Sequence, residues 1–168
     1  MALKQIATAT LSSPAATFSV SGITSNNPHI LVFHNWQSSD DTVTYNFRVT
    51  SSGTTDSSAI YSSAVRSMNS AGSGSDLSLS SNTLWQYSFG GTGTHETQMG
   101  IWHLYDFADA SKFSRVSFYG GGFTQTPRLD LFVGGVQVEN AQADDGITFV
   151  HHAGNVATCT ATIYEVLL

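Results

Sequence analysis

Residues 42–50 alternate strictly between polar and apolar side chains, and this pattern constrains the fold more than any other feature. The apolar positions of the segment are Val43, Tyr45, Phe47 and Val49. A period of two places all four on one face of an extended strand. This is the pattern of an antiparallel strand with one face in a core and one in water. Turn residues at 40–41 and 51–53 bound the segment on both sides.

Several other segments have the same alternation or are short apolar runs between clusters of Gly, Ser, Asn and Asp. We expect strands at residues 17–21, 30–36, 114–119, 129–133, 136–139, 146–150 and 156–166. This spacing predicts an all-β chain with the architecture of an antiparallel β-sandwich or jelly-roll-like single domain. The sandwich domain would comprise residues 17–168, preceded by residues 1–16 as an N-terminal arm or first strand.

Glycine and serine clusters predict the connections. The alternation of Leu129, Leu131 and Val133 stops at Gly134-Gly135, which predicts a tight hairpin turn there. Gly120-Gly121-Gly122 is expected to form a bend that lets backbones approach one another. Residues 70–81 are rich in Gly and Ser and are expected to form a long surface loop. Residues 57–69 have some apolar residues at helical spacing, but their many Ser and Thr favour a strand or loop over a helix.

The charge of the chain argues against several classes of partner. Only 11% of the 168 residues are charged, and the net charge is −6, whereas roughly 25% are charged in an average soluble protein. The six Lys and Arg residues are scattered and form no basic stripe, so we expect no nucleic-acid binding. No apolar run is long enough for a membrane helix, so we expect no membrane insertion. The first residues lack the apolar core of a signal peptide, which predicts synthesis in a cytoplasm.

The sequence contains no recognisable pattern of catalytic or metal-binding residues. There is no Gly-x-Ser-x-Gly elbow, only three Glu residues, and no His-x-His pair among six histidines. The single cysteine, Cys159, excludes an internal disulfide and lies in a predicted strand, where we expect it to be a small buried residue. We therefore predict that the protein is not an enzyme, with no catalytic residue, metal or cofactor.

Aromatic residues are the remaining candidates for a binding surface, if their rings face outward. They are Trp36, Trp85, Trp102 and Tyr119. Such rings can line a sugar-binding face or anchor a subunit interface, because each has a large apolar area and a polar group. The alternative is that each ring fills the core of the sandwich, and for any single ring the core is favoured.

Residues 101–112 resemble a segment found in structural proteins of tailed-bacteriophage virions. A strand leads into Asp106-Phe107-Ala108, followed by Asp109, a polar turn and Lys112, and then by a strand from Arg115 that ends in Gly120. Similar landmarks are Tyr45-Asn46-Phe47-Arg48, Gly146-Ile147-Thr148-Phe149 and Ala161-Thr162-Ile163-Tyr164-Glu165. The resemblance spans residues 18–168 loosely and departs from the family pattern after Arg48 and over residues 57–82.

The resemblance implies a β-sandwich virion protein, either a capsid decoration or cement protein or a tail or fibre subunit. Such proteins commonly form homotrimers and contact other virion proteins, and no catalytic residue belongs to the motif. We expect a subunit made in the host cytoplasm and located in the virion, acting through subunit contacts. The alternative is a carbohydrate-binding module or the receptor-binding head of such a virus, which would contact a host-surface glycan.

Overall fold

The computed structural model describes residues 2–41, 43–58, 60–90, 92–93, 95–124 and 128–168, with residues 87–90 and 124 described by backbone alone. Thr42 and Ala59, which fall within predicted segments, lie outside the described residues. Within these residues every regular element is a strand. The strands are β1 (Ala2–Leu11), β2 (Thr17–Ser21), β3 (His29–Ser38), β4 (Val43–Ser51), β5 (Thr54–Thr55), β6 (Tyr61–Asn69), β7 (Gly74–Asn82), β8 (Trp85–Gly90), β9 (Gln98–Tyr105), β10 (Phe113–Thr124), β11 (Arg128–Ala141), β12 (Gly146–His151) and β13 (Val156–Leu167).

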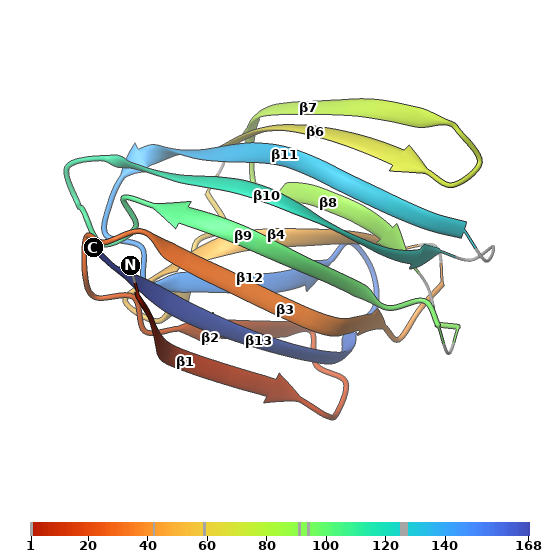
Figure 1. Ribbon diagram of the computed structural model, residues 1–168, viewed down its shortest axis with the longest axis horizontal. Coiled ribbons are helices and arrows are strands. Elements are labelled where there is room, and N and C mark those ends of the chain that lie inside the picture. The colour runs from red at the N-terminus through yellow and green to blue at the C-terminus, as the bar shows by residue number, and fades with distance from the viewer. Residues whose placement is uncertain (1, 42, 59, 91, 94, 125–127) are drawn as a thin grey trace.

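The strands form two antiparallel sheets that pack face to face, which confirms the predicted all-β sandwich. The larger sheet has the order β1-β13-β3-β9-β10-β11-β6-β7, and Figure 1 shows it from the edge strand β1 to the edge strand β7. The smaller sheet has the order β2-β12-β4, with β5 and β8 paired to successive parts of β4. The N-terminal strand β1 pairs with the last strand, β13.

The strand predicted from strict alternation is β4 in the smaller sheet. Val43, Tyr45, Phe47 and Val49 are all buried, as the period of two predicts. On one side β4 pairs with β12, and on the other with β5 and β8. Its inward face therefore supplies the middle of the smaller sheet's contribution to the core.

Aromatic rings from both sheets meet in the centre of the sandwich. Phe33 on β3 contacts Trp102 within its own sheet at a centroid distance of 5.3 Å, and Phe149 of the opposite sheet at 5.3 Å. Trp102 also contacts Phe47 of the opposite sheet at 4.0 Å. Edge-to-face and tilted pairs of this kind contribute about 0.5–1.5 kcal/mol beyond area burial. The cluster therefore both fills the core and fixes the spacing of the two sheets.

A glycine makes room for the ring at the centre of this cluster. Gly100 on β9 lies opposite Phe33 in the sheet, and a Cβ at Gly100 would come within 2.6 Å of the Phe33 ring. The ring cannot move aside, because Trp102 and Phe149 hold it from other directions. Only glycine at position 100 is therefore compatible with this packing.

Two glycine runs lie inside strands, so the hairpin turn predicted at Gly134-Gly135 and the bend predicted at Gly120-Gly121-Gly122 are wrong. The close approach of backbones expected at the second run is present, because a Cβ at Gly121 would lie 2.3 Å from the Asp130 carbonyl oxygen and one at Gly122 would lie 2.1 Å from that of Thr97. Gly134-Gly135 is in the middle of β11, and Gly120-Gly121-Gly122 is in the middle of β10, which continues past Gly120 to Thr124. At Gly134 a Cβ would lie 2.9 Å from the Phe118 ring and 2.3 Å from the Ala64 carbonyl oxygen. Glycine serves here to admit a neighbouring ring and backbone, a role that sequence alone does not separate from a turn.

The Ser- and Gly-rich segment also forms more regular structure than predicted. Residues 57–69 contain β6, as favoured over a helix, but residues 70–81 are not a loop, because most of them form the edge strand β7. The turn is confined to residues 70–73, where the Asn69 side-chain oxygen accepts hydrogen bonds from the backbone N–H groups of Ala71 and Ser73. The Asn69 side chain thus accepts hydrogen bonds from backbone N–H groups that have no partner strand within the turn, and a tight turn can therefore join β6 to β7.

Burial also lowers the pKa of a histidine at the end of β12. His151 is buried against Trp36, and its Nδ1 lies 3.0 Å from the carbonyl oxygen of Asn155. Burial lowers the pKa of His151 from 6.5 to about 4, and the Asn155 contact opposes this only in part. The adjacent His152, which lies just beyond the end of β12, is exposed.

Replacing Gly100 by Ala tests the packing of Phe33. We expect Gly100→Ala to lower the free energy of unfolding by about 1–3 kcal/mol, as overpacking does in a dense core. The measurement is urea unfolding followed by tryptophan fluorescence. The matched control is Gly135→Ala, where the nearest atom to the new Cβ is at 3.3 Å. An equal effect at both positions would contradict the special role of Gly100.

His151 predicts a loss of stability in acid. Its lowered pKa means that the unfolded chain binds the proton more tightly, so stability is full above pH 6.5 and declines as the pH falls toward 4. The loss would reach about 3 kcal/mol. His151→Asn retains a donor for Asn155 and should remove this part of the pH dependence, as measured by urea unfolding at pH 7 and pH 4.5. His152→Asn serves as the control and should behave as the wild type.

Candidate functional site: an apolar belt on the larger sheet

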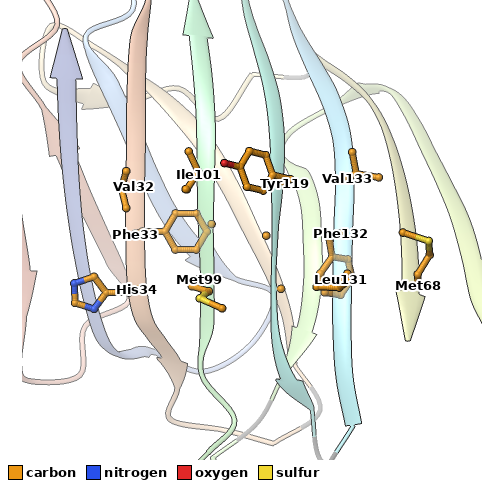
Figure 2. A pocket seen from close by; sticks show the side chains of 13 residues that line it. Val32, Phe33, His34, Met68, Met99, Ile101, Tyr119, Leu131, Phe132 and Val133 are labelled. Atoms are coloured by element: carbon orange, nitrogen blue, oxygen red, sulfur yellow. The ribbon is translucent and has the colours of Figure 1, made fainter. Parts of the chain in front are cut away.

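Two rows of apolar side chains cross the outer face of the larger sheet. The first row follows paired residues of neighbouring strands, namely Val32, Ile101, Tyr119 and Val133. The second row lies two residues further along the strands and contains His34, Met99, Gly121, Leu131 and Met68. Figure 2 shows both rows side by side. We call these nine residues the apolar belt.

A groove of about 540 Å³ runs between and over the two rows. Its floor contains Gly100 and Gly120, which pair with each other and lie between Phe33 and Phe132. The second row also lacks a side chain at its centre, because that position is Gly121. A Cβ there would lie 2.3 Å from the Asp130 carbonyl oxygen, so the sheet itself requires glycine at this point. The hollow is therefore built into the strand pairing.

The belt is exposed to an extent unusual for large apolar side chains. Met99 is 58% exposed, Tyr119 52%, and Leu131 and Val133 46% each. Single exposed apolar residues are common on proteins, but contiguous ones indicate an interaction surface. The belt contains no Lys, Arg, Asp or Glu, so no charge has to be desolvated when it is covered.

Polar groups bound the belt on both sides. The first row ends at Arg66 on β6, which forms an ion pair with Asp76 at 3.6 Å. At the opposite side, β13 and β1 carry a ladder of threonine hydroxyls, with Thr8 and Thr162 hydrogen-bonded at 3.0 Å. An apolar centre with a polar rim is the usual anatomy of a protein interface.

The sequence predicted the alternation of Leu131 and Val133 but not the face on which they lie. Both side chains point to solvent, whereas the inward positions of β11 are taken by Asp130 and Phe132. Asp130 is buried with Arg128 beside it, the Arg128 Nε donating to the carboxylate at 3.0 Å. A period of two identifies an apolar face without indicating whether it is covered by the same chain.

Of the four aromatic candidates, the structure leaves one at the surface. Trp36, Trp85 and Trp102 are wholly buried in the core, so none of them can face a ligand or a partner. Tyr119 is exposed and lies at the centre of the first row of the belt. The sequence alone does not single out the neighbouring belt residues, because aliphatic and methionine side chains are typical of a buried core.

The segment that resembles virion proteins forms the turn between β9 and β10. Asp106 has a φ of 61°, and its carboxylate accepts hydrogen bonds from Arg115 and, at 3.4 Å, from Lys112. Arg115 chiefly, with Lys112, lowers the pKa of Asp106. Phe107 is buried in the core. Asp109 accepts hydrogen bonds from the Ser111 hydroxyl at 2.6 Å and its N–H at 3.0 Å, and these contacts lower its pKa to about 2. The side-chain hydrogen bonds of Asp106 and Asp109 thus stabilise the turn between β9 and β10.

The described residues contain no assembled centre for metal binding. Among them, no three His, Cys, Asp or Glu side chains lie close enough together to hold a metal ion. Cys159 is buried, which raises the pKa of its thiol. Asp144 is also buried, and this raises its pKa to about 6, while Gln142 donates a hydrogen bond to it at 2.7 Å. The described part of the chain likewise contains no helix long and apolar enough to span a bilayer.

In comparisons with known proteins, no family model, no curated protein and no solved structure matches this chain.

Because Asp106 pairs with Arg115 and Lys112 in this turn, removing its charge should lower the stability of the protein by a small, salt-sensitive amount. Asp106→Asn keeps a side chain that tolerates positive φ but removes the charge that holds Arg115 and Lys112. We expect a loss of less than about 1 kcal/mol at low salt, and a smaller one in about 0.5 M NaCl, because exposed ion pairs are weak and screened. Thermal unfolding at both salt concentrations measures this. Asp76→Asn, at a more exposed pair, is the control and should show no loss.

Proposed function

We propose that this protein is a non-enzymatic structural subunit of a tailed-bacteriophage virion, as a capsid decoration or cement protein or as a tail or fibre subunit. It would be made in the host cytoplasm and act by burying its surfaces against other subunits. The observation that carries the proposal is the apolar belt, a neutral and exposed surface on the outer face of the larger sheet. The resemblance of residues 101–112 to virion proteins supports the choice of assembly.

The physical case rests on what an exposed apolar surface does in water. Covering such a surface gains roughly 25 cal/mol per Å² of apolar area. A free monomer gains nothing from leaving it exposed, and a chain with 11% charged residues has little charge repulsion to keep copies apart. A subunit that is permanently packed against neighbours avoids both problems. The homotrimer that the resemblance implies is one such assembly.

The composition of the belt supports the adhesive role over the glycan-binding alternative. Sugars bind by stacking on aromatic rings and by several hydrogen bonds from polar side chains around the ring. Only Tyr119 and His34 carry polar atoms among the belt side chains. The belt thus offers one ring and few hydrogen-bonding groups, which suits an apolar protein surface better than a hydroxyl-rich ligand.

The proposal predicts that the chain is a constituent of phage particles. Tailed-phage particles purified by density gradient from a culture that makes this chain should contain it in a fixed ratio to the major capsid or tail proteins, as measured by quantitative mass spectrometry. Washing in high salt should not remove it, because apolar contacts are not screened. A chain found only in the soluble fraction, and absent from intact particles, would contradict the proposal.

The glycan-binding alternative has its own test. We expect purified protein to bind no spot of a glycan array above background. Binding that is lost in Tyr119→Ala but kept in the control Phe113→Ala, an exposed aromatic residue outside the belt, would replace the adhesive role with glycan recognition at this ring.

A further inference from the structure

We propose that the apolar belt is covered by the same belt of a second copy of this chain, related by a two-fold axis that lies parallel to the sheet and crosses the strands above Gly120. The inference rests on the proposed function in one respect, that the belt is an adhesive surface. It goes further by naming the partner, the symmetry and the residues that face one another.

The central strand of the belt suggests this symmetry. Tyr119 and Gly121 both point outward from β10, on either side of Gly120, and they are the largest and smallest residues of the belt. A rotation of 180° about an axis above Gly120 reverses the strand direction and turns the face over. Position 119 of each copy then faces position 121 of the other. Each tyrosine ring enters the hollow that the other copy leaves at Gly121.

The same rotation brings the first row of one copy over the second row of the other. Ile101 then faces Met99, and Val133 faces Leu131. Each pair sets a β-branched side chain against an unbranched or γ-branched one. Methionine side chains have three rotatable bonds and fill irregular gaps, so Met99 can close the remaining space along the groove. At the edge of the belt the rotation places Met68 against Arg66 of the other copy, where the methionine can pack on the aliphatic part of the arginine side chain. The two faces are therefore complementary to themselves, as an isologous contact requires.

The size of the surface is sufficient for a stable contact. A standard interface takes about 800 Å² from each partner. The belt crosses five strands at a spacing of about 4.8 Å, so it is about 20 Å wide, and its two rows lie about 7 Å apart, so the belt alone supplies a few hundred Å². The whole outer face of the eight-stranded sheet covers on the order of 1,000 Å², so a contact of standard size would extend from the belt over β13 and β1 on one side and over β6 and β7 on the other. The belt would form the dry centre and the Thr ladder and the Arg66–Asp76 pair the rim. Two sheets packed in this way lie about 10 Å apart, as in a β-sandwich.

Charge does not oppose this contact, although each copy carries a net charge of −6. Two acidic residues lie near the belt, and each is paired within its own chain: Asp76 with Arg66 at 3.6 Å, and the buried Asp130, next to Leu131, with Arg128 at 3.0 Å. Like charges therefore do not meet across the belt. A second copy supplies the same neutral surface, whereas a partner that binds by charge would find nothing to pair with there.

The first test introduces a charge into the belt. Wild-type protein should be a dimer at micromolar concentration by sedimentation equilibrium, and Leu131→Glu should raise the dissociation constant at least about 100-fold, because each dimer would bury two unpaired carboxylates. The matched control is Leu168→Glu, since Leu168 is 90% exposed but lies beyond the end of β13 and outside the outer face of the sheet. It should dimerise as the wild type does. Circular dichroism checks that all three proteins are folded.

The second test addresses the two-fold register. Val133→Lys should also be monomeric, but an equimolar mixture of Val133→Lys with Leu131→Glu should dimerise again, because lysine at 133 of one copy faces glutamate at 131 of the other. A mixture of Val133→Lys with Met99→Glu should stay monomeric, since Met99 lies two strands away from Leu131.

The outcomes separate this inference from the proposed function. A wild-type monomer or a wild-type trimer overturns the two-fold belt contact, while the chain's presence in phage particles decides the proposed function independently. Equal recovery in both mixtures overturns the two-fold register. Dimerisation of the mixture of Val133→Lys with Leu131→Glu, and none in the mixture of Val133→Lys with Met99→Glu, supports the two-fold contact.

Discussion

The packing of Phe33 against glycine is the constraint on which the rest of the structure depends. Its ring joins the two sheets through Phe149 and Phe47, and it occupies the space that a side chain at Gly100 would fill. Because interiors are packed as densely as organic crystals, one such position sets the distance between the sheets for its neighbours. The wholly buried Trp102 packs edge-to-face beside it, with the ring centroids 5.3 Å apart.

The glycines of the larger sheet connect this interior to the outer surface. Gly100 lies under the Phe33 ring, and its partner Gly120 leads along β10 to Gly121, where a Cβ would meet the backbone of β11. The inward glycine makes room for the core, and the outward glycine leaves a hollow in the belt. The groove is thus a consequence of how β9, β10 and β11 pair. Leu131 and Val133, whose apolar side chains are typical of a core, lie exposed at the surface around this groove.

Burial and turn formation account for the shifted pKa values of the molecule. Burial is the main cause of the shifts at His151, Asp144 and Cys159. The lowered pKa values of Asp106 and Asp109 come from hydrogen bonds within the turn between β9 and β10. The belt is the feature of the described residues that core packing and turn formation do not explain.

The amino-acid sequence by itself determined five strands, β2, β3, β4, β12 and β13, with boundaries within two residues of the structure, because a period of two in side-chain polarity follows directly from the geometry of an extended chain. It also determined that Val43, Tyr45, Phe47 and Val49 share one buried face. It did not distinguish the glycines of β10 and β11 from turns, because both roles require the same missing side chain. Only the tertiary structure decided which apolar faces are covered by the opposite sheet. β10 and β11 have apolar residues on both faces, and a strand buries only the face that another layer of the same chain reaches.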